Sequence, residues 1–321
     1  MSLFLHSNAK KQKINNTRMR SRIIFYCVVM VLPLLQFCIF YIYTHINSFL
    51  LAFQDYSINK SGVGYDIVFA GIDNFKVAFD LLFGKGHLLK NSFITYVICN
   101  LGIICLSLIF SFYIYKRFVG HNLFRVILFM PQIVSGVVFA VLFQYITTNL
   151  YPDLVFRLTG DSVLGFLSRD SDTKFITLVL FSVWVGFGSN VLLFTGSMSG
   201  IDQSLVESAS LDGVNLIQEF WYITLPMIFP TITTFLVTGM AGIFNNQMNL
   251  YTFYGNAADP KIQNLAYYIY VQTKESDVIR PSLKYMSYSE IVALGLLLTA
   301  VVFPASFGLR KLLEKYGPRT D

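Results

Sequence analysis

The chain has 321 residues, of which 55% are hydrophobic and 13% are charged, and its mean hydropathy is +0.58. Soluble domains carry about 25% charged residues, so this composition excludes an ordinary soluble protein and indicates an integral membrane protein. The formal net charge is +6, but the basic residues stand beside apolar segments, which indicates membrane topology and contact with anionic lipid rather than a nucleic-acid partner.

Six apolar segments are long enough to cross a hydrocarbon core about 30 Å thick. They predict an all-α fold, an integral membrane protein with six transmembrane helices. In chain order the predicted spans are residues 23–43, 93–115, 126–146, 175–198, 226–248 and 291–309. Pro33 and Pro131 fall inside spans, where neighbouring helices can satisfy the freed backbone groups.

The segment before the first predicted span, residues 1–22, carries six Lys and Arg residues and no Asp or Glu. The apolar run that follows is too long for a secretory signal, and no small-residue cleavage pattern follows it. We therefore expect a basic cytoplasmic tail at 1–22 and one six-span domain over 23–315.

The two sides of the predicted membrane domain differ in charge. The side that holds both termini and the loop at 199–222 has a net charge of +7, and the other side has −1. Because Lys and Arg accumulate on the cytoplasmic side, we expect both termini and this loop to be cytoplasmic. The external segments are then 44–91, 149–174 and 249–290.

The sequence contains no recognisable catalytic or metal-binding motif. The four cysteines lie in the first two spans without a partner at ligand spacing, so we expect small buried apolar side chains; they are Cys27, Cys38, Cys99 and Cys105. No Gly-rich phosphate loop ends in Lys-Ser or Lys-Thr, so the chain cannot be its own ATPase. Predicted spans two to six hold no charged residue or His. That argues against an ion-coupled secondary transporter, and the lack of catalytic groups argues against a membrane enzyme.

The loop before the fifth predicted span mixes polar and apolar residues. Residues 204–212 have no Gly or Pro and can form a short helix, and Gly213 stands where a helix end favours a left-handed residue. Pro226 suits the first turn of the next helix. On these features alone, the segment could be an amphipathic connector resting on the lipid surface.

The same loop resembles the signature loop of the membrane subunits of ATP-driven, binding-protein-dependent importers. Seven positions match at the family spacing: Glu207, Ala209, Asp212, Gly213, Ile223, Leu225 and Pro226. Ser208 and Val214 replace small residues of the family pattern, and Tyr222 stands where a basic residue is common. Weaker resemblances occur at 69–75, 125–131, 244–247 and 265–270, whereas 255–260 departs from the pattern of sugar-specific members.

This resemblance implies a type I ABC importer transmembrane domain, the permease subunit of a sugar importer of the maltose-transporter-like class, in a bacterial cytoplasmic membrane. It implies a coupling helix at 204–213, and the residues implied to couple to the ATPase are Glu207, Ala209, Asp212, Gly213, Leu225 and Pro226. The implied partners are a second homologous permease, two ATP-binding subunits and an extracellular solute-binding protein. ATP and Mg²⁺ would be held by the ATP-binding subunits, with no cofactor in this chain.

The resemblance also implies positions along the solute path. They are Ser182, Gly186, Ser189, Gly239 and Asn246. Uncharged spans with amide side chains suit a neutral solute such as a carbohydrate, because an amide both donates to and accepts from hydroxyls. Asn246, seven residues after Gly239, is expected on the same face of the fifth span. Packing between helices by small and amide residues is the alternative role for all five.

Overall fold

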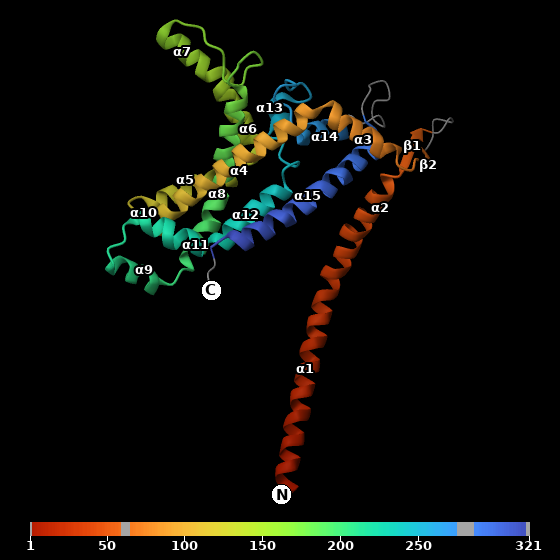
Figure 1. The fold of residues 1–321 in the computed structure, drawn as a ribbon, viewed down its shortest axis with the longest axis vertical. Coiled ribbons are helices and arrows are strands. Elements are labelled where there is room, and N and C mark those ends of the chain that lie inside the picture. Colours follow the sequence, from red (N-terminus) through yellow and green to blue (C-terminus); the bar gives the residue numbers. More distant parts are fainter. Residues whose placement is uncertain (1, 59–64, 275–285, 319–321) are drawn as a thin grey trace.

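The computed structural model describes residues 2–58, 65–274 and 286–318 (Figure 1). Its elements, in chain order, are α1 (Ser2–Phe37), a π-helical turn (Cys38–Tyr43), α2 (Thr44–Leu51), β1 (Gln54–Ile58), β2 (Tyr65–Phe69), α3 (Asp73–Gly84), α4 (Gly86–Tyr115), α5 (His121–Ile133), α6 (Gly136–Tyr145), a second π-helical turn (Ile146–Leu150), α7 (Tyr151–Thr159), α8 (Lys174–Ser199), α9 (Gln203–Leu211), α10 (Leu216–Glu219), a third π-helical turn (Phe220–Thr224), α11 (Leu225–Met227), α12 (Phe229–Ala241), α13 (Leu250–Tyr254), α14 (Leu265–Lys274) and α15 (Tyr288–Tyr316).

Four continuous helices within the described part of the chain are long and apolar enough to cross a membrane. They are Arg22–Leu51, α4, α8 and α15. Two further candidates are broken helices: α5 with Gly136–Thr159, bent by 100°, and Leu216–Met227 with α12, bent by 67°. Counting each broken pair as one span gives six. The fold is therefore that of a mostly helical membrane protein, as the sequence predicts.

The two breaks correct the prediction of continuous third and fifth spans. In the third, Pro131 lies in the last turn of α5, and Val134 is extended, with φ −82° and ψ 145°. In the fifth, Pro230 falls in the first turn of α12 directly after the break at Ile228. Because a proline cannot donate to the preceding turn and its ring clashes with it, the fifth span bends just before Pro230. The third span breaks after Pro131, where Val134 leaves the helical conformation. Pro226 accordingly lies inside the helical segment Leu216–Met227 and does not begin the span.

The fifth span also ends earlier than predicted. Helix α12 stops at Ala241 rather than near residue 248. Turns follow it, and Met248 and Asn249 adopt left-handed conformations with φ of 51° and 54°, which an α-helix cannot contain. Residues 245–247 are therefore outside the helix, and the expectation that Asn246 shares a helical face with Gly239 is wrong.

A small antiparallel hairpin interrupts the otherwise all-α fold. Strand β1 pairs with β2 in a register from Gln54 opposite Phe69 to Ile58 opposite Tyr65. It lies in the segment predicted to be external and connects the first long helix to α3. The side chain of Asn74 in α3 donates to the carbonyl groups of Ala52 and Gln54, at 3.0 and 2.9 Å, and so holds the base of the hairpin.

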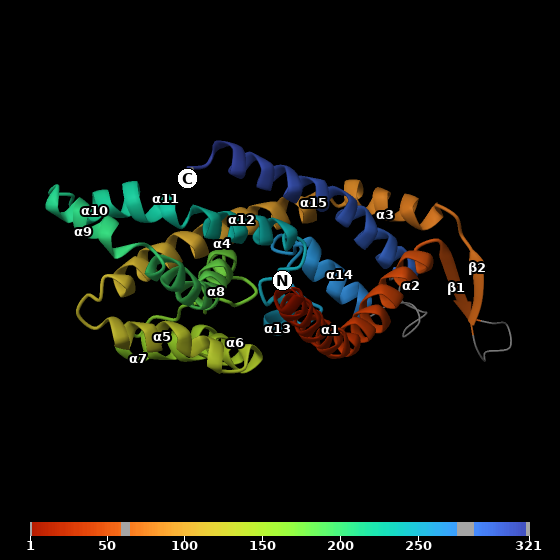
Figure 2. The same ribbon diagram turned by 90° about the horizontal axis from the view of Figure 1, so that it is seen from below.

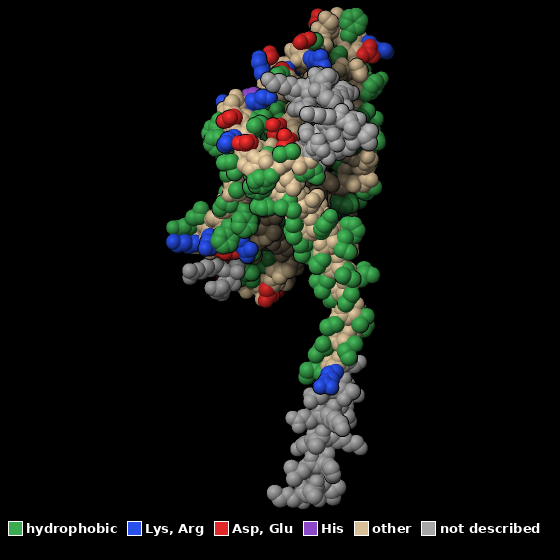
Figure 3. All heavy atoms as spheres, turned by 90° about the vertical axis from the view of Figure 1, so that its right-hand side faces the viewer, with side chains coloured by type: hydrophobic (Ala, Val, Ile, Leu, Met, Phe, Trp, Pro, Cys, Tyr) green, Lys and Arg blue, Asp and Glu red, His purple; other side chains and the backbone are tan. Residues whose placement is uncertain are grey.

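The first long helix stands apart from the rest of the chain (Figure 1). None of the most apolar window of Arg22–Leu51 is buried, and hydrophobic side chains cover its surface (Figure 3). Its last part, α2, packs against α15. Its apolar surface is therefore left for lipid or for another protein.

Helices α4 and α8 form the centre of the structure. The hydroxyl groups of Ser107 and Ser111 on α4 donate to the carbonyl groups of Phe187 and Val191 on α8, at 3.1 and 3.0 Å. Such polar contacts join helices where lipid supplies no hydrophobic driving force. Helix α8 also packs against α5, and α12 packs against α15 (Figure 2).

Gly188 determines how closely α8 approaches α5. A Cβ atom at this position would lie 2.0 Å from the carbonyl oxygen of Leu128. No side chain fits there, so the two backbones are in direct contact, which is how small residues act between membrane helices.

Candidate coupling loop and solute path

Helix α9 is a separate short helix whose first turn is capped. Asp202 precedes it in an extended conformation, and its carboxylate accepts from the backbone N–H of Ser204 at 3.0 Å. This hydrogen bond lowers the pKa of Asp202 below its ordinary value of 3.8. An Asp at this position stabilises a helix that is too short to be stable alone.

The end of α9 has the geometry that the sequence predicts. Gly213 adopts a φ of +80°, and the N–H of Val214 donates to the carbonyl group of Ala209 at 3.1 Å. A Cβ atom on Gly213 would meet nothing within 4 Å. The need for glycine here is therefore conformational rather than steric. The helix predicted over 204–212 and the left-handed Gly213 are confirmed.

The predicted coupling residues fall into two sets in the structure. Glu207, Asp212 and Gly213 are exposed and Ala209 is half-buried on α9 and its end. Leu225 and Pro226 are half-buried, and Leu225 packs against the apolar cluster of Val206, Met198, Ile201 and Ile228, among others. The residues on α9 and its end can therefore contact a partner protein. Leu225 and Pro226 instead pack the loop against the membrane helices.

Exposed apolar side chains surround α9, a feature that the sequence reasoning missed. They are Leu205, Leu211, Leu216, Ile217, Trp221 and Tyr222. Leu211 is 89% exposed at the end of α9, and Tyr222 is 78% exposed on the segment that follows. Apolar side chains gathered beside exposed carboxylates are typical of a protein-binding surface. The signal available in the sequence was a loop this rich in apolar residues around the predicted short helix.

An ion pair also joins this loop to α4. The ammonium group of Lys116, just past α4, contacts the carboxylate of Glu219 at the end of α10. The ring of Phe220 lies edge-on to that of Phe112, with centroids 5.0 Å apart. The sequence reasoning missed this contact, because nothing local relates a residue after span two to one 103 positions later.

Two of the predicted path residues are helix contacts. A Cβ atom on Gly186 would lie 2.6 Å from Cδ1 of Ile103, and one on Gly239 would lie 2.7 Å from the side-chain amide of Asn100. Both glycines therefore face α4 and allow α8 and α12 to approach it. Asn100 itself, an amide in an apolar span, was not among the predicted residues.

The other three path candidates do not lie together on one helix face. The hydroxyl group of Ser189 donates to the carbonyl group of Gly186 at 3.3 Å, and the buried hydroxyl group of Ser182 has no partner within the described residues. Asn246 is exposed beyond α12; its Oδ1 accepts from the N–H of Met248 at 2.9 Å. Ser182 and Ser189 therefore lie in α8, whereas Asn246 lies in a turn after α12.

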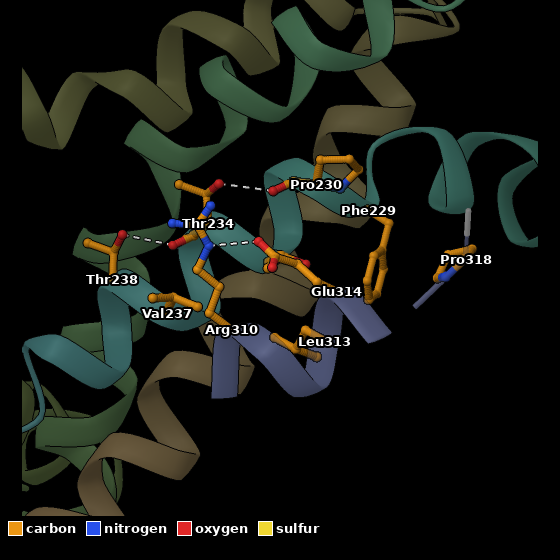
Figure 4. Close-up of a pocket in the computed structure, with 10 residues that line it drawn as sticks. Phe229, Pro230, Thr234, Val237, Thr238, Arg310, Leu313, Glu314 and Pro318 are labelled. Carbon is orange, nitrogen blue, oxygen red and sulfur yellow. Dashed lines mark hydrogen bonds and ion pairs between the residues drawn. The ribbon is translucent and has the colours of Figure 1, made fainter. Parts of the chain in front are cut away.

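A cavity of about 580 Å³ lies between the first half of α12 and the end of α15. Figure 4 shows Arg310 and Glu314 of α15 facing each other across from Thr234 and Thr238 of α12. The nitrogen Nε of Arg310 lies 2.7 Å from Oε1 of Glu314. Polar groups thus line the α9 side of the α12–α15 contact, which the sequence reasoning did not anticipate.

Cysteine and metal chemistry contribute nothing visible to these sites. Cys99 is buried, as predicted for all four cysteines, but Cys27, Cys38 and Cys105 are exposed on the surface of the chain, which corrects that prediction. They lie on helix faces that the chain itself does not cover. Among the described residues, no three or more His, Cys, Asp or Glu side chains come together as a metal site.

Comparison with known proteins extends the resemblance of the loop to most of the chain. Residues 102–316 match the family model described as "Binding-protein-dependent transport system inner membrane component". The chain is 25% identical, over 87% of its length and 85% of the relative's, to the arabinooligosaccharides transport system permease protein AraP of Bacillus subtilis (strain 168). It is 25% identical, over 67% of its length and 72% of the relative's, to the multiple sugar-binding transport system permease protein MsmF of Streptococcus mutans serotype c (strain ATCC 700610 / UA159).

The fold has a solved counterpart. The structure superposes with a TM-score of 0.69 on a chain of the bacterial alginate ABC transporter in complex with an alginate pentasaccharide-bound periplasmic protein. The match covers 91% of this chain and 94% of the other, at 18% sequence identity. At that identity the likeness concerns the fold alone.

Proposed function

Since the chain belongs to the family of binding-protein-dependent transport system inner membrane components, we propose that it conducts a carbohydrate, an oligosaccharide, across the bacterial cytoplasmic membrane. Members of this family are non-catalytic transmembrane subunits, so the chain is the permease of a binding-protein-dependent ABC importer. The solute class is the proposal.

The observation that carries the carbohydrate assignment is the similarity to AraP over most of both chains. That relative and MsmF are named for arabinooligosaccharide and multiple sugar transport. Predicted spans two to six are uncharged, which suits a neutral solute and disfavours ion coupling. The remaining alternative is a secondary, ion-coupled transporter, and it requires charged groups that these spans lack.

The importer would contain four further subunits or partners. A second homologous permease would pair with this chain, two ATP-binding subunits would hold ATP and Mg²⁺, and an extracellular binding protein would deliver the solute. Helix α9 would enter an ATP-binding subunit through Glu207 and Asp212, with the exposed Leu211 and Tyr222 packing beside it. Closure of the ATP-binding subunits would then move α9 and open the path alternately to the two sides.

The orientation of the chain is part of the same proposal. In Figure 1, α9 and the ends of α1 and α15 lie toward the lower side, and the hairpin, α7 and α13 lie toward the upper side. This arrangement supports a cytoplasmic position for both termini and α9, in accord with the distribution of Lys and Arg. Within this proposal, residues 1–22 are the basic cytoplasmic tail and residues 23–315 are the six-span domain.

For the solute path, the structure supports separate roles for the five candidates. Gly186 and Gly239 allow helices to approach α4, so we assign them to packing. Ser182, Ser189 and Asn246 remain proposed solute contacts, since a hydroxyl or an amide can bond to sugar hydroxyls. The cavity that contains Thr234 and Thr238 is a further candidate for the cytoplasmic part of the path.

The test is uptake by the complete transporter in proteoliposomes, with the permease pair, the ATP-binding subunits and the binding protein. We expect labelled neutral oligosaccharides to accumulate when ATP is inside, and to continue accumulating when an uncoupler collapses the proton gradient. Uptake that needs no ATP and stops with the uncoupler would establish the secondary transporter instead. Uptake confined to amino acids or ions would refute the carbohydrate assignment while leaving the family intact.

A further inference from the structure

A polar cavity of about 750 Å³ opens where α4 ends and α5 begins, on the side of the molecule where α9 lies. Lys116 and Arg117 line it on the turn between α4 and α5, and His121 and Arg125 line it on α5. Ser199 and Gln203 close it from the end of α8 and the start of α9. None of the residues that line it is an Asp or a Glu.

Two of these cations are not neutralised by the chain. Lys116 is paired with Glu219. Arg117 and Arg125 are exposed, and neither forms an ion pair or a side-chain hydrogen bond among the residues that the structure describes. The cavity therefore presents two free guanidinium groups. This group binds phosphate oxygens through two parallel hydrogen bonds, which makes arginine the preferred residue for phosphate recognition.

The cavity lies at the ends of candidate membrane spans. Three spanning helices end or begin around it, namely α4, α5 and α8. Apolar side chains alternate with the two arginines along the same segment: Val119 is 94% exposed, and Leu123 and Val126 are also exposed. Cations beside an uncovered apolar face match the two parts of a phospholipid, a charged headgroup and its acyl chains.

We propose that this cavity binds the phosphate of an anionic phospholipid from the leaflet on the α9 side, with the acyl chains along the exposed face of α5. Gln203 and Val206 of α9 line the same cavity. A bound headgroup therefore contacts the short helix α9 as well as the ends of the spans. The lipid composition of the membrane would then affect the position of α9. The proposal does not depend on which solute is transported.

The test uses the purified full chain in detergent, titrated with phosphatidylglycerol or with phosphatidylcholine of identical acyl chains and followed by native mass spectrometry. We expect the chain to bind phosphatidylglycerol more tightly. Replacing both arginines, Arg117→Gln with Arg125→Gln, should weaken phosphatidylglycerol binding about 30-fold and bring it close to that of phosphatidylcholine. The matched control is Arg157→Gln with Arg169→Gln, which removes two exposed charges from the segment at 149–174, outside the cavity, and should change binding less than twofold.

A second variant guards against misfolding of the first. Asn122→Trp fills the cavity without changing its charge, and it should also displace phosphatidylglycerol while the melting temperature stays near that of the parent chain. Equal binding by the parent and both variants would overturn the proposal, as would an equal loss in the control with Arg157 and Arg169 replaced. Full competition by glycerol 3-phosphate would assign the site to a free phosphate compound. Unchanged lipid binding with weaker binding of the ATP-binding subunit would assign the cavity to that protein.

Discussion

The ammonium group of Lys116 and the carboxylate of Glu219 meet between the end of α4 and the end of α10, with only 18% and 10% of their side chains exposed. Rings of Phe112 and Tyr115 flank the ammonium group, with centroids 5.8 and 5.5 Å away. Removing one member of such a pair leaves a charge without its partner in a poorly solvated place. The pair therefore fixes the segment after α9 to a spanning helix.

We expect Glu219→Gln to destabilise the chain by about 1–3 kcal/mol, less than a fully buried pair because some solvent reaches both groups. The measurement is thermal unfolding of the purified chain in detergent. The double exchange Lys116→Glu with Glu219→Lys should recover part of the loss. The matched control is Glu314→Gln, because the Arg310–Glu314 pair is more than half exposed and should change stability by less than about 1 kcal/mol. Equal effects of the two Gln variants would contradict a special role for the pair.

Substitutions in and after α9 should separate coupling from folding. Glu207 is exposed and forms no hydrogen bond or ion pair among the described residues, so Glu207→Ala should assemble normally but reduce solute-stimulated ATP hydrolysis and uptake. Gly213→Ala should cost about 1 kcal/mol, because alanine in the left-handed region is strained although the space is open. Gly213→Val should be worse. Full uptake and full stimulated ATPase activity in both Glu207→Ala and Gly213→Val would remove the coupling role.

Labelling should place α9 and the loop before α14 on opposite sides of the membrane. Single cysteines at Gln203 and Lys261, both exposed, can be tested in a background without the four native cysteines. Cys99 is buried there and calls for a small replacement. An impermeant maleimide applied from outside to intact cells should label position 261, and position 203 only after the cells are opened. Labelling of both positions from one side would contradict the six-span arrangement.

The loop that contains Asp259 should lose stability in acid. Asp259 Oδ2 lies 2.6 Å from Nζ of Lys174, and its Oδ1 accepts from the N–H of Lys261 at 2.9 Å. The hydrogen bond from Lys174 is the largest cause that lowers the pKa of Asp259 below its ordinary 3.8. Because the folded pKa lies below the unfolded one, the contribution is present above about pH 4 and is lost as the pH falls through the folded pKa.

Asp259→Asn should therefore lower the melting temperature at pH 7, by about 1 kcal/mol of stability, and should match the parent chain at low pH. Melting curves of both proteins between pH 7 and pH 3 give the comparison. Asp73→Asn is the control, since the Asp73–Lys76 pair is largely exposed and should contribute little at any pH. A gap that stays constant with pH would show that the ion pair is not its source.

Two substitutions at Asn246 can separate a solute contact from a structural one. The Oδ1 acceptor holds the turn to Met248, while the Nδ2 group has no partner among the described residues. Asn246→Asp keeps the acceptor and removes the donor, so the fold should stay intact while uptake per assembled complex falls about 2- to 13-fold. Asn246→Ala should lose both the turn and the uptake. If Asn246→Asp leaves uptake per complex unchanged, the residue is structural.

The parts of the fold that could be predicted are those that depend on local sequence. The span predicted at 175–198 is α8, Lys174–Ser199, because an uninterrupted apolar run leaves a helix few places to end. Helix α9 was predictable for the same reason: Asp202 and Gly213 define its two ends within the loop itself. In both cases the decisive interactions join residues a few positions apart.

The parts that could not be predicted depend on contacts between distant segments. The apolar content of a segment does not show whether it forms one continuous helix. The bends at Val134 and Ile228 were therefore missed, although a proline lies within three residues of each. The packing role of Gly239 depends on Asn100, which no local pattern associates with it. The residues of the solute path were inferred from a resemblance between sequences. Such a resemblance assigns positions along the chain, but it does not show where the helix ends and turns begin.

The backbone contact between Gly188 and Leu128 has a mechanical consequence. It fixes α5 to α8, the serine hydrogen bonds fix α8 to α4, and Val206 seats α9 on the cluster that α4 and α8 share. These contacts join the four helices, so we expect them to move as one body. Displacement of α9 is expected to carry α4, α5 and α8 with it, so that the strain collects where α5 ends and makes Val134 a hinge of the molecule.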